Sequence, residues 1–352
     1  MVWVGRGETN REDLDASGPW IDEQSRCFSV SFWADKCVLV TGGSGFLGRH
    51  VVARLGALPC RKVVVPRSRD YNLVTESAVE VLYADVHPDI VIHLAVSVGG
   101  IAANQKHPGK FLYENLMMGT LLMEYGRRYE IDKFVGIGTV CSYPKHAAVP
   151  FVEDEIWSGY PEETNAFYGL AKKMMMVQTQ AYYEEYEFNS IHLLMVNLYG
   201  PGDNIDPNSS NVIPALIRRV FEAKARGDDE LVVWGDGSPT REFLYCEDAA
   251  EGILLAAEHY DRSEPVNLGS GMEISIRDLA EKIRELAGFP GRIVWDTTKP
   301  NGQPRRCLDV SRAEAGFNFR ASTSFEKGLR ETVEWYRSVA SSPDPLPTVS
   351  PT

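Results

Sequence analysis

The sequence predicts an α/β protein with a Rossmann-type, doubly wound parallel sheet and a smaller C-terminal α/β region. Three observations support this fold class. Short apolar runs alternate with helical stretches through the first 200 residues, a glycine-rich segment follows the first of these runs, and the alternation breaks after Gly200-Pro201. Such alternation is typical of βαβ units, whose right-handed crossovers build a parallel sheet with helices on both faces.

The expected strands are short apolar runs of the kind that parallel sheets bury on both faces. They cover residues 38–40, 62–65, 90–94, 134–137 and 191–196. Helical stretches lie between them, at residues 49–58, 76–83, 111–129 and 166–186. Beyond the break we expect a helix over 212–225, a short strand over 231–233, and a helix over 248–259 that returns to the sheet.

The chain is expected to divide into four parts. Residues 1–31 are polar and acidic without periodicity, which predicts a flexible N-terminal arm. Residues 32–201 with 244–270 form the expected dinucleotide-binding domain, and residues 202–243 with 271–339 form a substrate-binding region. That region would cap the carboxyl ends of the strands, where ligands bind in such folds. Residues 340–352, rich in Ser and Pro, are expected to be a disordered tail.

The segment from Thr41 to Gly48 has the pattern of a loop that binds a dinucleotide phosphate. Gly42 allows a tight turn, Gly45 lets the backbone approach a pyrophosphate, and Gly48 permits close packing of helix on strand. The N-terminus of the following helix offers free N–H groups and a partial positive charge. Such glycines can also be purely structural, so the loop alone is a weak indication.

Tyr168 and Lys172 strengthen this interpretation. Residues four apart share one face of a helix, so the Lys172 ammonium is expected to lower the pKa of the Tyr168 phenol. A Tyr-xxx-Lys pair on its own is usually a surface pair. Behind a dinucleotide-binding loop, we interpret it as a proton donor with its supporting cation.

The composition excludes several classes of function. The 352 residues carry a net charge of −13, with no basic stripe for nucleic acid to bind. No apolar run is long enough to span a bilayer, and nothing resembles a signal peptide. The six cysteines are scattered without CxxC spacing, which argues against a disulfide framework or a zinc site. We therefore expect a cytoplasmic protein with no metal centre, no nucleic-acid partner and no membrane partner.

The order of four motifs carries a family resemblance. The glycine loop is followed by Gly-Thr-Val-Cys-Ser-Tyr-Pro at 138–144, by Tyr168 to Lys172, and by Asn-Leu-Tyr-Gly-Pro at 197–201. In this order the motifs resemble the extended short-chain dehydrogenase/reductase family. Shorter stretches resemble its GDP-L-fucose synthase subgroup, at residues 98–101, 162–165, 208–219, 241–244 and 304–310. The resemblance runs from about Phe32 to Trp335 and implies an NADPH-dependent epimerase/reductase acting on GDP-4-keto-6-deoxymannose.

The cofactor is expected to be NADP(H). No carboxylate follows the second strand, where NAD-binding proteins usually hold the ribose hydroxyls. Arg67 lies there instead, with Arg69 nearby, and an arginine suits a 2′-phosphate through a charge-assisted bidentate contact. The alternative is that Arg67 and Arg69 are solvated surface residues that bind no ligand. The resemblance adds further cofactor contacts at Phe46, Leu47, Leu94, Ala95, Lys172, Asn197 and Leu198.

The resemblance also implies catalytic roles. Tyr168 would deliver a proton to the sugar ketone, Lys172 would bind the nicotinamide ribose, and Thr139 would polarise the ketone. Cys141 occupies the position of the cysteine that exchanges protons at carbons 3 and 5 in the family. The partner in that exchange is a histidine in the family, and here the residue is Asn211.

Asn211 has no usable pKa near neutrality, so it cannot exchange protons as imidazole does. Three explanations remain open: a weakened fucose synthase, a relative that only reduces position 4 or epimerises one centre, or a different group that replaces the histidine. A 4-keto reductase or 4-epimerase of another nucleotide sugar is the alternative enzyme. A non-catalytic dinucleotide-binding regulator is the alternative from a different class.

By position, the family residues that hold the GDP-sugar match Thr139, Asn197, Arg219, Trp234 and Arg241. Arginines suit the phosphates and the indole suits stacking on the base. The resemblance further implies a homodimer through the helices at 111–129 and 166–186. Their methionines are expected to pack against the partner's copies, at Met117, Met118, Met174, Met175 and Met176.

Overall fold

The larger part of the molecule is built on a six-stranded parallel sheet. A computed structural model describes residues 28–341 except 100, 208 and 300. The strand order is β2-β1-β3-β4-β5-β9. The strands are β1 (Cys37–Thr41), β2 (Lys62–Val64), β3 (Ile90–His93), β4 (Lys133–Thr139), β5 (Ser190–Met195) and β9 (Val266–Leu268). Every residue of β1, β3, β4 and β5 is buried, which explains why these strands are rich in apolar residues.

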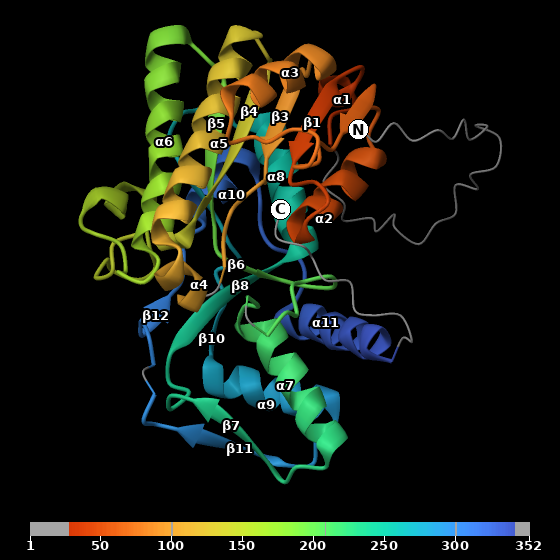
Figure 1. The fold of residues 1–352 in the computed structure, drawn as a ribbon, viewed down its shortest axis with the longest axis vertical. Coiled ribbons are helices and arrows are strands. Elements are labelled where there is room, and N and C mark those ends of the chain that lie inside the picture. Colours follow the sequence, from red (N-terminus) through yellow and green to blue (C-terminus); the bar gives the residue numbers. More distant parts are fainter. Residues whose placement is uncertain (1–27, 100, 208, 300, 342–352) are drawn as a thin grey trace, which may run out of the picture.

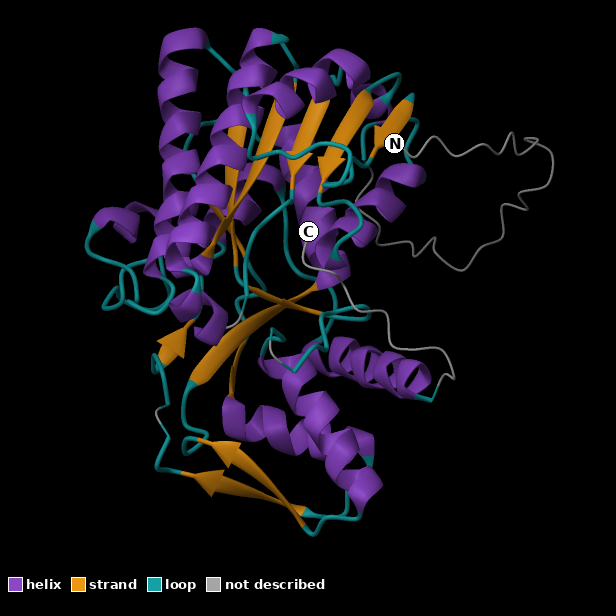
Figure 2. Cartoon of the chain, in the orientation of Figure 1, coloured by secondary structure: helices purple, strands orange, loops and turns teal. Residues whose placement is uncertain are grey.

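Helices cover both faces of this sheet (Figures 1 and 2). Three of them, α2 (Phe46–Gly56), α8 (Cys246–His259) and α10 (Ser311–Phe317), share one hydrophobic core with Val38 and Val40. On the other face, α3 (Glu76–Val86), α5 (Pro108–Arg128) and α6 (Ala166–Tyr186) share a separate core with Cys37 and Leu39. Successive residues of β1 thus enter opposite cores, as the two-residue period of a strand requires. The predicted doubly wound fold is confirmed.

The smaller part lies beyond the carboxyl ends of the strands (Figure 1). Its four-stranded sheet places β8 (Thr240–Tyr245) beside β10 (Glu273–Ser275), β12 (Arg305–Arg306) and β6 (Asn197–Tyr199). A separate parallel pair joins β7 (Glu230–Trp234) to β11 (Arg292–Asp296). The helices α7 (Val212–Arg226), α9 (Ile276–Ala287) and α11 (Phe325–Ala340) share a second hydrophobic core with these strands.

All the predicted strands and helices are present, most of them longer by a few residues. The sequence did not indicate β6, β8, β9, β10, β11, β12, α9, α10 or α11, nor the short helices α1 (Val30–Trp33), α4 (Ile101–Lys106), η1 (Val140–Ser142) and η2 (Glu153–Trp157). The short strands have too few residues to show a period. The domain boundaries stay a prediction, but α10 packs against α8 and β9 although its residues were assigned to the substrate-binding region.

The N-terminal arm was predicted to reach residue 31, whereas α1 begins at Val30. The backbone N–H of Ser29 donates to Glu258 on α8 at 2.5 Å, and buried Trp33 donates to the same carboxylate at 3.0 Å. These contacts attach residues 29–33 to the body of the protein. The rest of the predicted arm, at 1–27, and the predicted tail beyond residue 341 lie outside the described residues.

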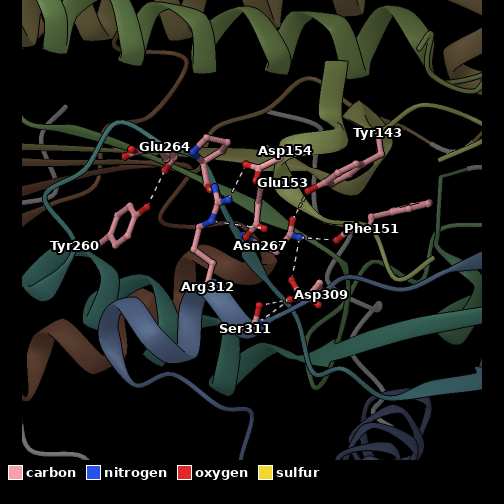
Figure 3. A network of polar contacts seen from close by, with 11 residues as sticks. Tyr143, Phe151, Glu153, Asp154, Tyr260, Glu264, Asn267, Asp309, Ser311 and Arg312 are labelled. Carbon is pink, nitrogen blue, oxygen red and sulfur yellow. Dashed lines mark hydrogen bonds and ion pairs between the residues drawn. The ribbon is translucent and has the colours of Figure 1, made fainter. Parts of the chain in front are cut away.

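Asn267 on β9 connects three segments at the edge of the sheet (Figure 3). Its amide nitrogen donates to the carbonyls of Phe151 and Asp309 at 2.9 and 3.0 Å, and its amide oxygen accepts from the Tyr143 hydroxyl at 2.7 Å. Its backbone N–H donates to buried Glu153 at 2.8 Å. Because Asn267 is fully buried, its polar groups cannot bond to water, and these hydrogen bonds satisfy them instead.

We expect Tyr143→Phe to lower the free energy of unfolding by about 1–2 kcal/mol, because it leaves a buried amide oxygen without its donor. Asn267→Ala removes three side-chain bonds and should lower it by about 3 kcal/mol or more. Denaturant unfolding measures both values. The same chemical change at the exposed Tyr160, Tyr160→Phe, is the control. A loss in Tyr143→Phe no larger than in this control would contradict the importance of the network.

Candidate functional site

At Gly42 and Gly48, the loop between β1 and α2 is packed too closely for a side chain. Gly42 has φ +69°, and a Cβ there would lie 2.6 Å from the backbone nitrogen of Ala95. A Cβ on Gly48 would lie 2.1 Å from the carbonyl oxygen of Gly42. Gly45 is the N-cap of α2, which begins with Phe46 and Leu47. Because Gly45 has no side chain, it does not cap the first N–H groups of the helix. The loop therefore has the tight geometry that phosphate binding at a helix N-terminus requires.

The loop lies where the sheet order reverses, since β1 pairs with β2 on one side and β3 on the other. Leu94 and Ala95 follow β3 and donate their backbone N–H groups to Thr41, at 3.1 and 3.3 Å. Arg67 and Arg69 follow β2 and are exposed. The Arg69 guanidinium lies 3.6 Å from the carboxylate of Asp70. Ligands of open α/β sheets bind at such a reversal.

Thr139, Cys141 and Tyr168 meet beyond the end of β4. Thr139 ends the strand, and its hydroxyl accepts the N–H of Cys141 at 3.2 Å. Gly169, the residue after Tyr168, packs directly on this turn, because a Cβ there would lie 2.4 Å from the carbonyl oxygen of Cys141. Ser142 fixes the same contact by donating to the Gly169 carbonyl at 2.9 Å. The first turn of α6 thus holds Tyr168 against Thr139 and Cys141.

The proton affinities in this cluster differ from the sequence prediction. Burial raises the pKa of the Tyr168 phenol, the nearby Cys141 raises it further, and a hydrogen bond with Thr139 lowers it. Burial also lowers the pKa of the Lys172 ammonium to about 8. The expectation that Lys172 pulls the pKa of Tyr168 down is therefore wrong for this structure. Desolvation decides the direction, and it keeps the phenol protonated.

Two buried histidines lie beneath Lys172. His192 on β5 is fully buried, and neither ring nitrogen has a hydrogen-bond partner. Burial, with the Lys172 charge nearby, lowers its pKa to about 3, so the ring is neutral. The His192 ring lies over β4, where a Cβ on Gly138 would approach its Nε2 to 2.3 Å. His93 on β3 is also buried, and its Nδ1 lies 2.8 Å from the Thr41 hydroxyl.

The smaller sheet contributes two arginines to the same site. Arg241 on β8 and Arg306 on β12 are register partners. The Arg306 guanidinium lies 3.8 Å from the Cys141 sulfur. Burial and, to a smaller extent, the neighbouring Arg306 lower the pKa of Arg241 to about 10. Across the described residues, neither guanidinium forms an ion pair with a carboxylate.

Arg306 had no role in the sequence analysis, although it lies in a stretch that resembles the subgroup. The available indication was the pair of adjacent arginines at 305 and 306. Only the pairing with β8 shows that Arg305 turns to Glu273, at 2.7 Å, while Arg306 turns to Cys141.

The remaining predicted substrate residues are spread along the smaller part. Asn197 and Leu198 form β6, where the Asn197 amide donates to the Glu242 carbonyl at 3.4 Å. The Arg219 guanidinium on α7 donates to the carbonyl of Val232. Trp234 ends β7 with its side chain 68% exposed, and Lys299 lies 5.7 Å from the ring centre.

Asn211 is the exposed N-cap residue of α7, and its side chain does not cap the helix. No contact of the described residues joins it to Cys141 or Tyr168. The roles assigned to all these residues from sequence stay predictions.

A protein-family model, the NAD dependent epimerase/dehydratase family, matches residues 38–269. The chain belongs to this family. Its similarity to GDP-L-fucose synthases is also high: a relative from Oryza sativa named probable GDP-L-fucose synthase 1 is 40% identical over 310 residues, covering 87% of this chain and 94% of the relative. The predicted extended short-chain dehydrogenase/reductase resemblance is confirmed, and the chain is an enzyme of that type.

Two solved structures of epimerase/dehydratase relatives are similar in fold and sequence. A GDP-6-OMe-4-keto-L-xylo-heptose reductase from Campylobacter jejuni has a TM-score of 0.82 at 25% identity, covering 86% of this chain and 98% of its own. A GDP-L-fucose synthetase from Naegleria fowleri bound to NADP has a TM-score of 0.78 at 28% identity, covering 87% of this chain and 95% of its own.

In this family member, Gly169→Ala should reduce kcat by about 10²-fold. The added methyl would push Tyr168 away from Cys141, and a displacement of about 1 Å at a reacting centre has that order of effect. Steady-state NADPH oxidation measures the change. Gly56→Ala, at the far end of α2 with no atom within 4 Å of the new Cβ, is the control. Equal activity in the two variants would show that the contact does not position Tyr168.

Proposed function

We propose that this enzyme is an NADP(H)-dependent epimerase/reductase of a GDP-sugar, acting on GDP-4-keto-6-deoxymannose or a close relative. The observation that carries the proposal is the meeting of Thr139, Cys141 and Tyr168 with two arginines of the smaller sheet. The first three groups serve proton transfer to and beside a ketone. The arginines suit the diphosphate that a nucleotide sugar carries.

Reduction needs a proton for the ketone oxygen. Tyr168 donates it, because burial keeps the phenol protonated. The Thr139 hydroxyl donates a second hydrogen bond to the oxygen and polarises the carbonyl. The glycine loop, Arg67 and Lys172 would hold NADPH, which would supply the hydride for the carbonyl carbon.

Several observations support NADP(H) over NAD(H). Arg67 and Arg69 lie exposed after β2, close in sequence to the strand that borders the glycine loop. An arginine there suits a 2′-phosphate. The similar Naegleria fowleri structure is bound to NADP.

The substrate's nucleotide is assigned to the smaller part of the protein. Trp234 presents a largely exposed indole on which a base can stack, and Arg219 lies on the neighbouring helix with its guanidinium at the β7 carbonyl of Val232. Arg241 lies closer to the reacting groups, near Cys141. We therefore propose that the base lies at Trp234, the diphosphate at the arginines and the sugar beside Cys141.

Epimerisation at carbons 3 and 5 requires a base and an acid. Cys141 is the base in this proposal, since it lies beside Tyr168 and Arg306. Asn211 cannot serve as the acid. We therefore propose that epimerisation is slow, and that the second candidate function is simple reduction of a 4-keto GDP-sugar. The similar Campylobacter jejuni protein is named as a reductase of such a sugar, which favours this second candidate.

A homodimer is proposed through α5 and α6. Their outer faces expose Tyr113, Phe167, Met174 and Val177, and α5 and α6 pack side by side (Figure 1). The methionine prediction is wrong in part, because Met118, Met175 and Met176 are buried within the protomer. Of the predicted methionines, Met174 is exposed and Met117 is half-buried.

We propose a cytoplasmic location. Cys37, Cys60, Cys141, Cys246 and Cys307 form no disulfide. Of the helices described, none has the length and apolar character needed to cross a bilayer.

The decisive experiment for the function is proton NMR in D₂O with GDP-4-keto-6-deoxymannose and NADPH. We expect NADPH oxidation with slow deuterium incorporation at carbons 3 and 5. Asn211→His should speed the incorporation by about 10²-fold or more, the usual effect of a positioned acid. NADPH oxidation without deuterium would support the 4-keto reductase. The absence of both would exclude this substrate, and a Tyr168→Phe variant as active as wild type would exclude the proposed chemistry.

Arg67→Ala should raise the KM for NADPH about 10–100-fold while leaving the KM for NADH within about twofold, because only NADPH carries the 2′-phosphate. Arg61→Ala is the control, since this arginine is also exposed but pairs with Asp89 at 3.1 Å. Equal loss for both cofactors would mean that Arg67 does not recognise the 2′-phosphate.

A further inference from the structure

A row of paired residues crosses the parallel sheet beneath α6. Thr41 on β1 is the register partner of His93 on β3. Gly136 on β4 is in turn the partner of His93 on one side and of His192 on β5 on the other. Register partners of a parallel sheet point to the same face. Two buried imidazoles therefore lie two strands apart on one face, with a glycine between them.

The imidazole of His192 occupies the space that two glycines leave on β4. A Cβ at Gly138 would lie 2.3 Å from its Nε2, and a Cβ at Gly136 would lie 3.4 Å from its Nδ1. The ring thus lies across β4 with Nε2 toward the carboxyl end of the strand. Both nitrogens are buried, and neither has a hydrogen-bond partner among the described residues. Buried polar groups almost always bond to protein or to ordered water, so this ring requires an explanation.

Helix α6 places Lys172 over the Nε2 end of this ring. Met175 contacts β4 at Gly136, where a Cβ would lie 3.3 Å from its Cε, and Gly169 contacts the turn after β4. Lys172 is three residues from each of these contacts, about one helical turn in either direction. Because α6 runs back along β4, Lys172 lies over the part of the strand between the two contacts. That part is the carboxyl end, where the Nε2 of His192 lies.

Lys172 is a buried cation that lacks a counter-ion. It is 4% exposed, and burial lowers the pKa of its ammonium to about 8, with no carboxylate of the described residues to oppose the shift. Burial, and after it the Lys172 charge, lower the pKa of His192 to about 3 and that of His93 well below its usual value. Both imidazoles are therefore neutral, and a neutral imidazole has one nitrogen that accepts a hydrogen bond.

The elements packed against α6 are α5, β4, β5 and η1. Here η1 contributes Cys141, β5 contributes His192, and β4 contributes glycines. On α6 itself, burial keeps the Tyr168 phenol protonated. The carboxylates of α5 pair within α5, Glu114 with Lys110 at 3.8 Å and Glu124 with Arg127 at 2.8 Å. The neutral imidazole of His192 is thus the side chain placed to accept a hydrogen bond from the Lys172 ammonium.

We propose that His192 is a positioning residue that holds the Lys172 ammonium through one bridging water. The water accepts a hydrogen bond from the ammonium and donates one to Nε2 of the imidazole, whose proton is on Nδ1. A bridging water satisfies buried polar groups that do not reach each other directly. The bridge favours the charged form of Lys172 and fixes the direction of its Nζ. The contribution of this Nζ to cofactor binding rests on the proposed function, whereas the bridge itself does not.

NMR of the full chain, labelled with ¹⁵N in histidine and ¹³C at the lysine ε-carbon, tests the bridge without substrate or cofactor. The Lys172 signal is identified by its loss in Lys172→Met, and the His192 signal by its loss in His192→Gln. Wild-type His192 should stay neutral from about pH 5 to 9, with Nε2 as the acceptor. Its ¹⁵N shift should change as Lys172 titrates near pH 8. A His192 signal that does not respond to this titration would overturn the proposal.

His192→Leu removes the acceptor at similar volume, and should lower the pKa of Lys172 by about one pH unit because a hydrogen bond to a charged group is lost. His192→Gln keeps an acceptor and should recover most of the wild-type value. Ser190→Ala is the matched control, because Ser190 lies on the same face of β5 and its buried hydroxyl also has no partner among the described residues. It should leave the pKa of Lys172 unchanged. The same pKa in His192→Leu as in wild type would contradict the bridge.

The KM for NADPH, measured against pH, gives a second readout. A charged Lys172 binds the ribose hydroxyls better than a neutral one, so the KM should rise as the pH passes the pKa of Lys172. In His192→Leu this rise should begin about one pH unit lower, which makes the KM about fivefold higher than wild type at pH 8 and nearly equal at pH 6. A loss of the same size at every pH would indicate a packing defect and would overturn the proposal.

Thermal unfolding shows that each variant is folded before its values are compared. If the pKa of Lys172 falls in His192→Leu but the KM for NADPH does not follow, the bridge is supported and the proposed contact of Lys172 with the cofactor fails. If His192→Leu unfolds at a higher temperature with the pKa of Lys172 unchanged, the imidazole only fills space, and the proposal fails. The two conclusions are therefore separable.

Discussion

The buried carboxylate of Glu242 is the contact on which the arrangement of the two halves depends. Glu242 has no exposed surface, and it accepts the backbone N–H groups of Ser270, Gly271 and Leu308 at 2.6, 2.8 and 2.6 Å. These donors come from the chain after β9 and the chain after β12. Burial raises the pKa of Glu242, and the three donors oppose this by stabilising its charge. One side chain thereby fixes β8 to both segments and directs the preceding residue, Arg241, to the opposite face of the strand.

The sheet and the glycine loop could be predicted from the sequence because their signals are local. A strand buried on both faces is an unbroken apolar run, and the loop needs glycine wherever another side chain would collide with backbone. The smaller part lacks such signals. β12 has only two residues, and its position depends on pairing with β8. The place of α10 depends on Ala313 and Phe317, which enter the core under α8, and no period in the sequence indicates that contact.

The candidate site shows the same limit. Spacing placed Tyr168 and Lys172 on one helix face, and it identified the residues at the end of β4. Spacing did not reveal how deeply these side chains are buried. Lys172 is only 4% exposed, so desolvation outweighs the effect of its charge on the pKa values of this cluster. Nor did it reveal Arg306, whose side chain reaches Cys141 only because the chain after β12 is bonded to Phe151 and Glu242. Depth and contacts between distant segments are properties of the tertiary structure.

The close approach of Gly138 and His192 restricts how this protein can evolve. The imidazole fills the space above Gly138, so a side chain at 138 is tolerated only if position 192 first becomes smaller. The reverse order leaves a cavity near Lys172. A Cβ at position 138 would also lie 2.9 Å from Leu194, so a side chain beside Thr139 needs space from both neighbours.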